Sequence, residues 1–388
     1  MKCRMTSFEF ATATRIIFGR GTVRQLPGLA RELGKKVLVV TGRDPSRVYP
    51  VLAEVEALGL QVTTLPIAAE PTVDDVRRGA SIALKNGNDV VIGLGGGSAM
   101  DAGKAIAAMA RQPRDVLHYL ELVGEGRALD EKPLPFFAVS TTAGTGAEVT
   151  RNAVLVSAEN GVKASLRHPS MLPLLALVDP ELARGCPPEI TAASGMDALT
   201  QCLEAYVSCR AQPMTDALCT EGIRRAMRSL EKAVNDGDDL DAREDLALAA
   251  LFSGMALANA GLGAVHGFAA PIGGSFKAGH GAVCAALLAP VWTGNWTVIQ
   301  RTGHIGAKTK FEAASRLLLN DQRATPEDAH ASLQALARRL RIPPLRCHGI
   351  QKSDFDVIAT KAAQAGSMKG NPVPLSHEDL LAMLHAAF

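Results

Sequence analysis

The 388-residue sequence predicts two domains, an α/β domain built on a parallel sheet and an all-helical domain after it. Up to about residue 180, short apolar runs that suit strands alternate with longer segments of helical period, and beyond it the strand-like runs cease. The chain is also longer than one typical domain, and its hydrophobic fraction of 47% is enough to bury a large core.

Five apolar runs are expected to form the strands of the sheet. They are Val37–Thr41, Val62–Leu65, Val90–Leu94, Phe136–Ser140 and Leu174–Val178. Between them, Pro50–Leu58 and Asp74–Lys85 carry apolar residues every three to four positions, which marks one face of a helix. Strands that alternate with helices favour a parallel sheet covered by helices.

The pattern changes after Asp179-Pro180 and Cys186-Pro187-Pro188, where segments rich in Ala and Leu take over with helical period. We therefore divide the chain near residue 184, into an α/β domain of residues 1–184 and a helical domain of residues 185–388. The acidic run from Asn235 to Asp245 is interpreted as a solvated loop and helix start.

Charge and cysteine content exclude several classes of function. The 41 basic and 39 acidic residues nearly cancel, so the chain lacks the basic field that nucleic acid or an anionic membrane would attract. The seven cysteines are an odd number without a CxxC pair, which fits neither a disulfide framework nor a thiolate zinc site. The N-terminal residues lack the apolar segment of a secretory signal. We expect a cytoplasmic protein that acts on a small molecule.

One uncharged stretch, Leu246–Phe276, is long enough to span a bilayer. Ser253, Asn259, His266, Pro271 and several glycines interrupt it. A buried helix with a polar end is therefore favoured over a membrane span.

A glycine-rich loop is the first chemical feature. The apolar run that begins at Val90 leads into Gly95–Gly97, and Ser98 and Asp101 have the spacing of a capping box that opens a helix. Consecutive glycines let the backbone approach a diphosphate, and the free N–H groups of a helix start bind anions. Neither the Walker consensus nor the usual GxGxxG fingerprint is met. An anion site is predicted, with a simple reversal turn as the alternative.

A second polar segment, Ser140–Thr150, directly follows an expected strand. Its small hydroxylated residues and glycines offer a low wall with several hydrogen-bond donors, which suits a nucleotide at the carboxyl ends of parallel strands. An ordinary polar turn is the alternative. Because both segments follow strands, we expect them to share a ligand.

The pair GGGS-x-x-D-x-x-K at Gly95–Lys104 and STTAGTG-x-E at Ser140–Glu148 resembles the signature of the iron-containing alcohol dehydrogenase family. The likeness continues over most of the chain, through Val178–Pro180, Gly195–Thr200, Glu204–Ser208 and Asn259–Gly267. It implies a Rossmann-like dinucleotide-binding domain before an all-α domain, the architecture of dehydroquinate synthase-like proteins. It also implies NAD(P)-dependent interconversion of a small alcohol and its aldehyde or ketone, by a homodimer or a larger homo-oligomer.

The same resemblance implies the contacts of an NAD or NADP cofactor. Its pyrophosphate would lie on the glycine loop, and its adenine and nicotinamide sides along the threonines. NAD-preferring members often carry aspartate after the first strand, where Gly42 would not repel a 2′-phosphate and Arg43 could pair with one, so NADP is permitted. The implied cofactor-binding residues are Gly42, Arg43, Gly95, Gly96, Gly97, Ser98, Asp101, Thr141, Thr142 and Thr145.

A divalent-metal site, for iron or zinc, is the third implication. Family members use one aspartate and three histidines as ligands, of which Asp197, His266 and His280 are present, whereas Gln201 stands at the remaining histidine position. Asp197 and Gln201 lie four residues apart and share a helix face. An amide oxygen is a weaker ligand than imidazole for these metals, so metal-bound and metal-free sites are equally favoured.

A second departure is Ala270, four residues after His266, where the family usually has a histidine near the substrate. A bound metal would polarise the substrate oxygen. Without it, His266, His280 or Gln201 would have to donate hydrogen bonds, as in a keto-acid reductase of the maleylacetate reductase type. A non-redox nucleotide-binding enzyme on the same scaffold is the third possibility. His266 and His280 are the catalytic candidates in each redox reading.

Overall fold

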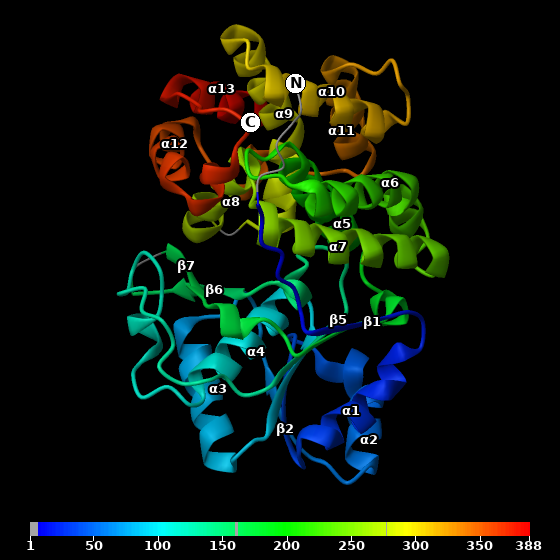
Figure 1. Ribbon diagram of the computed structural model, residues 1–388, viewed down its shortest axis with the longest axis vertical. Coiled ribbons are helices and arrows are strands. Elements are labelled where there is room, and N and C mark those ends of the chain that lie inside the picture. Colours follow the sequence, from blue (N-terminus) through cyan, green and yellow to red (C-terminus); the bar gives the residue numbers. More distant parts are fainter. Residues whose placement is uncertain (1–6, 160–161, 277) are drawn as a thin grey trace.

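The computed structural model describes residues 7–159, 162–276 and 278–388. One of the seven cysteines, Cys3, lies outside these residues. So does most of the N-terminal segment that was compared with a secretory signal. The chain has two parts, one built on a parallel sheet and the other mostly of helices (Figure 1). The predicted fold class is confirmed, while the boundary near residue 184 stays a prediction.

The main sheet of the described residues has the strand order β1-β8-β5-β4-β2-β3, and all neighbours in it are parallel. Its strands are β1 (Arg15–Phe18), β2 (Lys36–Thr41), β3 (Gln61–Pro66), β4 (Val90–Gly95), β5 (Phe136–Ser140) and β8 (Leu175–Val178). The five predicted strands agree with these to within one residue at each end. β1 was not predicted, because it is a four-residue edge strand without a fully buried side chain.

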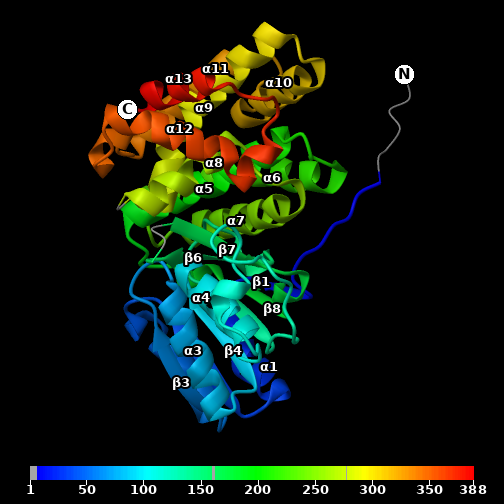
Figure 2. The same ribbon diagram turned by 90° about the vertical axis from the view of Figure 1, so that its left-hand side faces the viewer.

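Helices cover both faces of this sheet (Figures 1 and 2). Along β2, Val37 and Val39 join the core beneath α1 (Leu26–Leu33) and α2 (Tyr49–Ala57), whereas Leu38 and Val40 join the opposite core. That second core lies beneath α3 (Val73–Asn86) and α4 (Gly97–Met109). Burial on both faces explains why the strands read as continuous apolar runs.

An antiparallel hairpin, β6 (Asn152–Ser157) and β7 (Val162–Arg167), was not predicted. Its inward residues alternate with half-exposed ones, but the half-exposed positions of β6 also carry valines, so the polar half of the alternation is weak. The hairpin lies between α4 and the helical part.

The second part consists of helices and short 3-10 turns among the described residues. The helices are α5 (Pro188–Val207), α6 (Pro213–Asn235), α7 (Leu240–Ala260), α8 (Ala264–Ser275), α9 (His280–Thr302), α10 (Ile305–Leu319), α11 (Pro326–Arg339), α12 (Phe355–Gln364) and α13 (His377–Ala387). The 3-10 helices of both parts are η1 (Thr22–Gln25), η2 (Pro45–Val48), η3 (Val116–His118), η4 (Ala147–Val149), η5 (Pro169–Met171), η6 (Pro180–Ala183), η7 (Leu345–His348), η8 (Lys352–Asp354) and η9 (Gly366–Gly370).

The uncharged stretch Leu246–Phe276 is not the single buried helix that we expected. It is divided between α7 and α8, which are bent by 98° at the break. Gly261 and Gly263 lie in this break. Glycine is among the residues that least favour a helix, which explains why the helix ends here. By length and composition α9 could also cross a membrane, but 67% of its apolar window is buried within the protein, as in a core helix.

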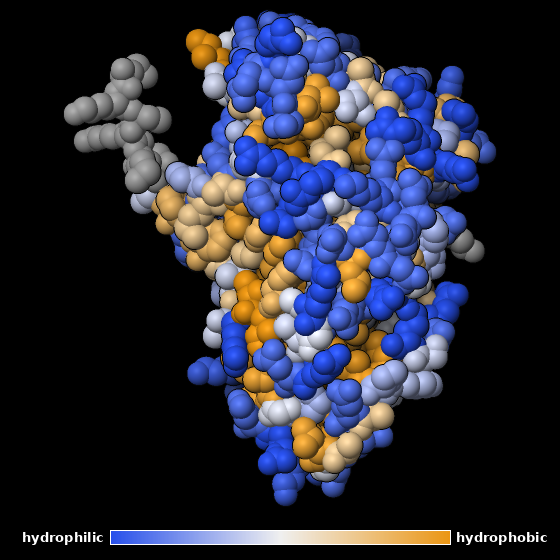
Figure 3. All heavy atoms as spheres, turned by 90° about the vertical axis from the view of Figure 1, so that its right-hand side faces the viewer, coloured by the Kyte–Doolittle hydropathy of each residue, from blue (hydrophilic) through white to orange (hydrophobic). Residues whose placement is uncertain are grey.

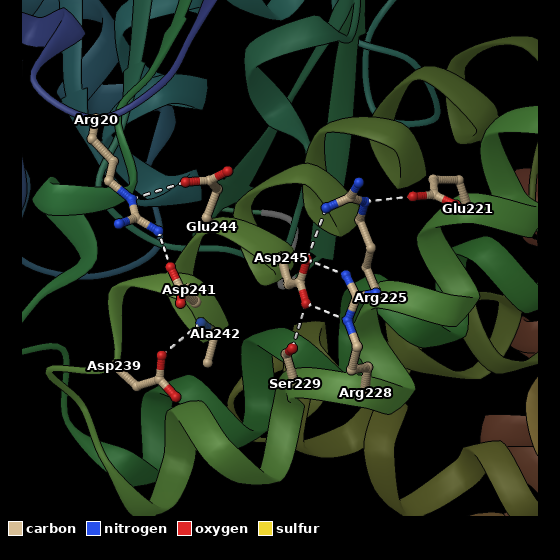
Figure 4. Close-up of polar contacts among 10 residues, drawn as sticks. All are labelled: Arg20, Glu221, Arg225, Arg228, Ser229, Asp239, Asp241, Ala242, Glu244 and Asp245. Atoms are coloured by element: carbon tan, nitrogen blue, oxygen red, sulfur yellow. Dashed lines mark hydrogen bonds and ion pairs between the residues drawn. The ribbon is translucent and has the colours of Figure 1, made fainter.

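The two parts are joined by close backbone contact and by ion pairs. Gly146 has a φ of 62°, and a Cβ on it would lie 2.3 Å from the Cα of Gly254 in α7, so neither residue has room for a side chain. Arg20, after β1, pairs with Asp241 and Glu244 at the start of α7 (Figure 4). Four residues along from Asp241, Asp245 accepts hydrogen bonds from Arg225, Arg228 and Ser229 of α6. The acidic run is therefore structural, as predicted.

Candidate active site

The glycine loop joins β4 directly to α4. Gly96 is the N-cap, so the helix begins at Gly97 with its first N–H groups unused by the helix itself. A Cβ on Gly95 would lie 2.7 Å from Ala99 Cβ and 3.3 Å from the backbone nitrogen of Gly42. Glycine is therefore required at residue 95, and the loop leads into a helix start with free N–H groups; that these groups bind an anion stays a prediction.

The structure brings the two polar segments together. The N–H of Thr141 donates to the carbonyl of Gly95 at 3.0 Å. A Cβ on Gly96 would lie 3.3 Å from Thr142 Oγ1, and one on Gly97 would lie 3.0 Å from Thr145 Oγ1. All of these residues except Gly95 are partly exposed, as is Ser98, so they line one accessible surface at the carboxyl ends of β4 and β5.

The predicted capping box of Ser98 and Asp101 is wrong. The glycines let α4 begin before Ser98, which is the helix's second residue, and no side chain caps the N-terminus. Asp101 Oδ2 instead accepts the N–H of Val154 in β6 at 3.0 Å. Burial raises the pKa of Asp101 to about 6, against the opposing effect of Lys104. Asp101 thus anchors the hairpin to α4.

Lys104 is buried and fastens α4 to the threonine segment. This role was not predicted. Its Nζ donates to the carbonyls of Ala147 and Asn152 at 2.8 and 2.9 Å and to Thr150 Oγ1 at 3.0 Å. Burial lowers its pKa to about 8. The glycine loop and the threonine segment are therefore held in fixed register.

Gly42 and Arg43 follow β2, the neighbour of β4. Gly42 lies beside the glycine loop, and Arg43 is exposed at its rim, where Nε donates to the carbonyl of Ala68 at 2.8 Å. The guanidinium of Arg43 therefore lies beyond the carboxyl end of β2, where the resemblance permitted a contact with a 2′-phosphate.

The candidate metal ligands meet at the junction of three helices of the second part. Asp197 comes from α5, His266 from α8 and His280 from the first turn of α9. Asp197 Oδ1 lies 3.2 Å from His266 Nε2 and 3.8 Å from His280 Nε2. Asp197 and His266 are buried, whereas the His280 side chain is 35% exposed, so the cluster faces solvent on the α9 side.

Glu204 orients His266, a role that the sequence did not reveal. It lies one further turn along α5 from Gln201 and accepts a hydrogen bond from His266 Nδ1 at 2.7 Å and from the N–H of Val265 at 2.7 Å. In the neutral imidazole, the proton is therefore held on Nδ1, and the lone pair of Nε2 points toward the cluster. Carboxylates that hold histidine ligands in this way are typical of metal sites.

Gln201 presents its nitrogen, not its oxygen, to the cluster. Its Nε2 donates to Asp197 Oδ2 at 3.2 Å, and its Oε1 accepts from Ser253 Oγ at 2.8 Å. The side chain lies where the resemblance implied, but it holds Asp197 rather than offering a free ligand atom. Its assignment as a ligand stays a prediction.

Cys284, one turn after His280, completes the cluster and was missed. Its Sγ lies 3.7 Å from Nε2 of both His266 and His280. One donor atom each from Asp197, His266, His280 and Cys284 lie within 4.8 Å of one another. The spacing of His280 and Cys284, four residues apart, could have revealed it.

The electrostatics of this cluster suit a cation. Asp197 Oδ1 is buried and makes no hydrogen bond of good geometry among the described residues, and its neighbours are the Nε2 atoms of His266 and His280 at 3.2 and 3.8 Å. A cation between these atoms would satisfy the oxygen. Burial lowers the pKa of His266, but Cys284 and the carboxylates of Asp197 and Glu204 raise it well above the usual value. Cys284 likewise raises the pKa of His280 to about 9. Without a metal, the acidic surroundings therefore favour a proton on these histidines. A divalent cation would supply the positive charge in place of the Nε2 protons, and the donor atoms fit such an ion.

Ala270 lies one turn after His266 in α8 and is exposed. The methyl group has nothing to donate or accept, so the proton relay that a histidine would provide is missing at this position.

Comparison with known proteins identifies both halves of the chain. The family described as "Iron-containing alcohol dehydrogenase" matches residues 13–180, and "Fe-containing alcohol dehydrogenase family, C-terminal" matches residues 191–388. Alcohol dehydrogenase 4 of Saccharomyces cerevisiae is 33% identical over 382 residues, covering 96% of each chain. The crystal structure of a 1,3-propanediol oxidoreductase has a TM-score of 0.91 at 33% identity, over 99% of this chain and 100% of that one. Sulfoacetaldehyde reductase from Bifidobacterium kashiwanohense, solved with NAD+, has a TM-score of 0.85 at 25% identity, over 98% and 99%.

Proposed function

The chain belongs to the iron-containing alcohol dehydrogenase family and is an alcohol dehydrogenase, and from this premise we propose an NAD(P)-dependent, metal-assisted reaction. The nicotinamide, held by the glycine loop and the threonine segment, would supply hydride chemistry toward the carbon of a small alcohol or of its aldehyde or ketone. The observation that carries the proposal is the convergence of Asp197 Oδ1 and the Nε2 atoms of His266 and His280, which lie 3.2 and 3.8 Å from that oxygen in a mostly buried cluster.

The chain's own residues prepare this reaction. The N–H groups at the start of α4 would bind the diphosphate. Thr142 and Thr145 would border the cofactor beside the loop. Asp197, His266 and His280 would hold a cation, which would supply Lewis acidity toward the substrate oxygen. Glu204 keeps the Nε2 atom of His266 directed at the cluster. Ala270 cannot relay a proton, so His280, whose side chain is 35% exposed, is the candidate for exchanging the substrate proton with solvent.

A metal-independent carbonyl or keto-acid reductase is the second candidate. It is favoured by Gln201, whose Nε2 faces the cluster as a hydrogen-bond donor and would polarise a carbonyl without a cation. Both candidates use the same cofactor surface. The NAD+ complex of the sulfoacetaldehyde reductase supports NAD, whereas the exposed Arg43 supports NADP.

Metal analysis combined with turnover tests the proposal. Protein purified without added metal is assayed for iron and zinc, and NADH and NADPH oxidation is followed with a panel of aldehydes and keto acids before and after chelation. We expect near-stoichiometric metal and loss of aldehyde reduction on chelation, with recovery when metal is restored. Undiminished turnover in metal-free protein would instead establish the second candidate.

A further inference from the structure

We propose that Cys284 is a metal ligand in this chain and replaces the ligand lost at Gln201, which gives an Asp-His-His-Cys site suited to zinc. The inference rests on the proposed metal-assisted function. It concerns which side chains bind the metal, so it can fail while metal binding itself stands.

Four of the six distances among the donor atoms are close to those of a tetrahedral zinc site, and the other two are within 4.8 Å. Zinc bonds of about 2.0–2.1 Å to nitrogen or oxygen and about 2.3 Å to sulfur place tetrahedral ligand atoms roughly 3.3 Å apart, or roughly 3.6 Å where one is sulfur. Asp197 Oδ1 lies 3.2 and 3.8 Å from the two Nε2 atoms, and Cys284 Sγ lies 3.7 Å from each of them. The side chains therefore need only small adjustments to coordinate one ion.

The helix α9 explains how a cysteine reaches this position. His280 is its first residue and Cys284 follows one turn later, so both side chains lie on the same helix face. Cys284 is buried, and its Sγ faces the Nε2 atoms of His266 and His280 and the carboxylate of Asp197. The cysteine is thus directed into the cluster rather than into the apolar core.

Gln201 is engaged in a different task. Both ends of its amide are used, since Nε2 donates to Asp197 Oδ2 and Oε1 accepts from Ser253. The contact with Oδ2 leaves Oδ1 as the coordinating oxygen of Asp197. Gln201 is therefore a positioning residue that holds the carboxylate, and Cys284 supplies the fourth ligand atom.

The ligand change predicts the metal. Thiolate ligands select softer cations, and a tetrahedral site with mixed sulfur and nitrogen donors is characteristic of zinc. The absence of a CxxC pair does not conflict with this site, because only one thiolate takes part and its partners come from three helices.

Cobalt substitution tests the ligand directly, without any assay of activity. Metal-stripped wild-type protein is titrated with Co²⁺ while the near-ultraviolet charge-transfer band of a cobalt–thiolate bond is recorded, and zinc competition then gives relative affinities. The variants are Cys284→Ser, Gln201→Ala and the matched control Cys202→Ser, a buried cysteine of α5 whose Sγ faces the carbonyl of Ala249. Circular dichroism of each metal-free variant verifies folding.

We expect the band in wild type, Cys202→Ser and Gln201→Ala. Cys284→Ser should lack the band and bind zinc at least about 10–100-fold more weakly, the loss typical when even an outer support of a metal ligand is removed. A Cys284→Ser variant with the band and with unchanged affinity overturns the inference. Cobalt binding by wild type without the band also overturns it but leaves the metal-assisted function intact, whereas failure to bind either metal overturns both.

Discussion

Glu204 positions the imidazole of His266. It accepts the Nδ1 proton of His266 and the N–H of Val265, so the imidazole has one orientation. We expect Glu204→Gln to weaken zinc binding about 10–100-fold, because the neutral amide holds the imidazole less firmly and makes Nε2 a poorer ligand. Zinc competition against a chromophoric chelator measures this. Glu189→Gln, at an exposed position of the same helix, is the control, and equal affinities in the two variants would contradict the prediction.

Among single residues, only those side chains that match the family's motif could be predicted from the sequence. Asp197, His266 and His280 were predicted in this way and lie together in the structure. Glu204 and Cys284 were not predicted, because their roles arise where α5, α8 and α9 meet. Helical spacing places Glu204 near Gln201 and Cys284 near His280, but it does not say which helices face one another.

Among the elements, the junction of α4 with η4 contains buried ionisable groups that should make stability depend on pH. Burial raises the pKa of Glu148 to about 7 from an ordinary value of 4.5, against the opposing effect of Lys104. Between these two values the folded protein keeps a proton that the unfolded chain has lost. Stability therefore falls as pH rises through this window, by up to about 3 kcal/mol from this group at roughly 1.4 kcal/mol per pKa unit.

Glu148→Gln tests this dependence, because the amide stays neutral at every pH. We expect the melting temperature of wild type to fall more than that of the variant between about pH 5 and pH 7.5. Asp101, whose pKa burial also raises, contributes a dependence of the same sign in both proteins. Glu56→Gln, an exposed carboxylate in α2, should behave like wild type. Parallel melting curves for wild type and Glu148→Gln would rule out a raised pKa at residue 148.

The elements were predicted well where burial on both faces gave unbroken apolar runs, as in β2 and β4. They were missed where that signal is short or mixed, as in the edge strand β1 and the β6–β7 hairpin. The capping box failed because glycines can start a helix without a side-chain cap. Local spacing therefore indicated a helix start correctly but placed its N-cap two residues too late, at Ser98 instead of Gly96.

For the whole molecule, the change of periodicity near residue 180 was enough to predict the class of each part. It could not show how the parts are joined, since the backbone contact of Gly146 with Gly254 involves residues more than a hundred positions apart. These glycines read as features of a nucleotide loop and of a helix, yet each also lets the threonine segment lie directly on α7. The proposed cofactor surface is thus packed directly against the helices of the second part.

The edge of the main sheet indicates where a second copy of the chain would bind. Among the described residues, β1 pairs with β8 alone, and its Ile16, Ile17 and Phe18 are only partly buried. Apolar side chains also gather beneath the N-terminal segment (Figure 3), in which Phe8 is 43% exposed. An open edge strand beside exposed apolar surface is a site for pairing between chains. The resemblance implied a homo-oligomer without locating its interface, and we propose that the protein dimerises through this edge.

Light scattering across a dilution series measures this association. We expect wild type to have the mass of a dimer or a multiple of it, and Phe8→Lys to dissociate at higher protein concentration, because the introduced charge would be buried against apolar surface. Leu84→Lys replaces an equally apolar, 69% exposed side chain on the outer face of α3 and should leave the mass unchanged. A monomeric wild type would show that the β1 edge is stable unpaired. Dissociation of both variants alike would mean that added charge, rather than this edge, governs the assembly.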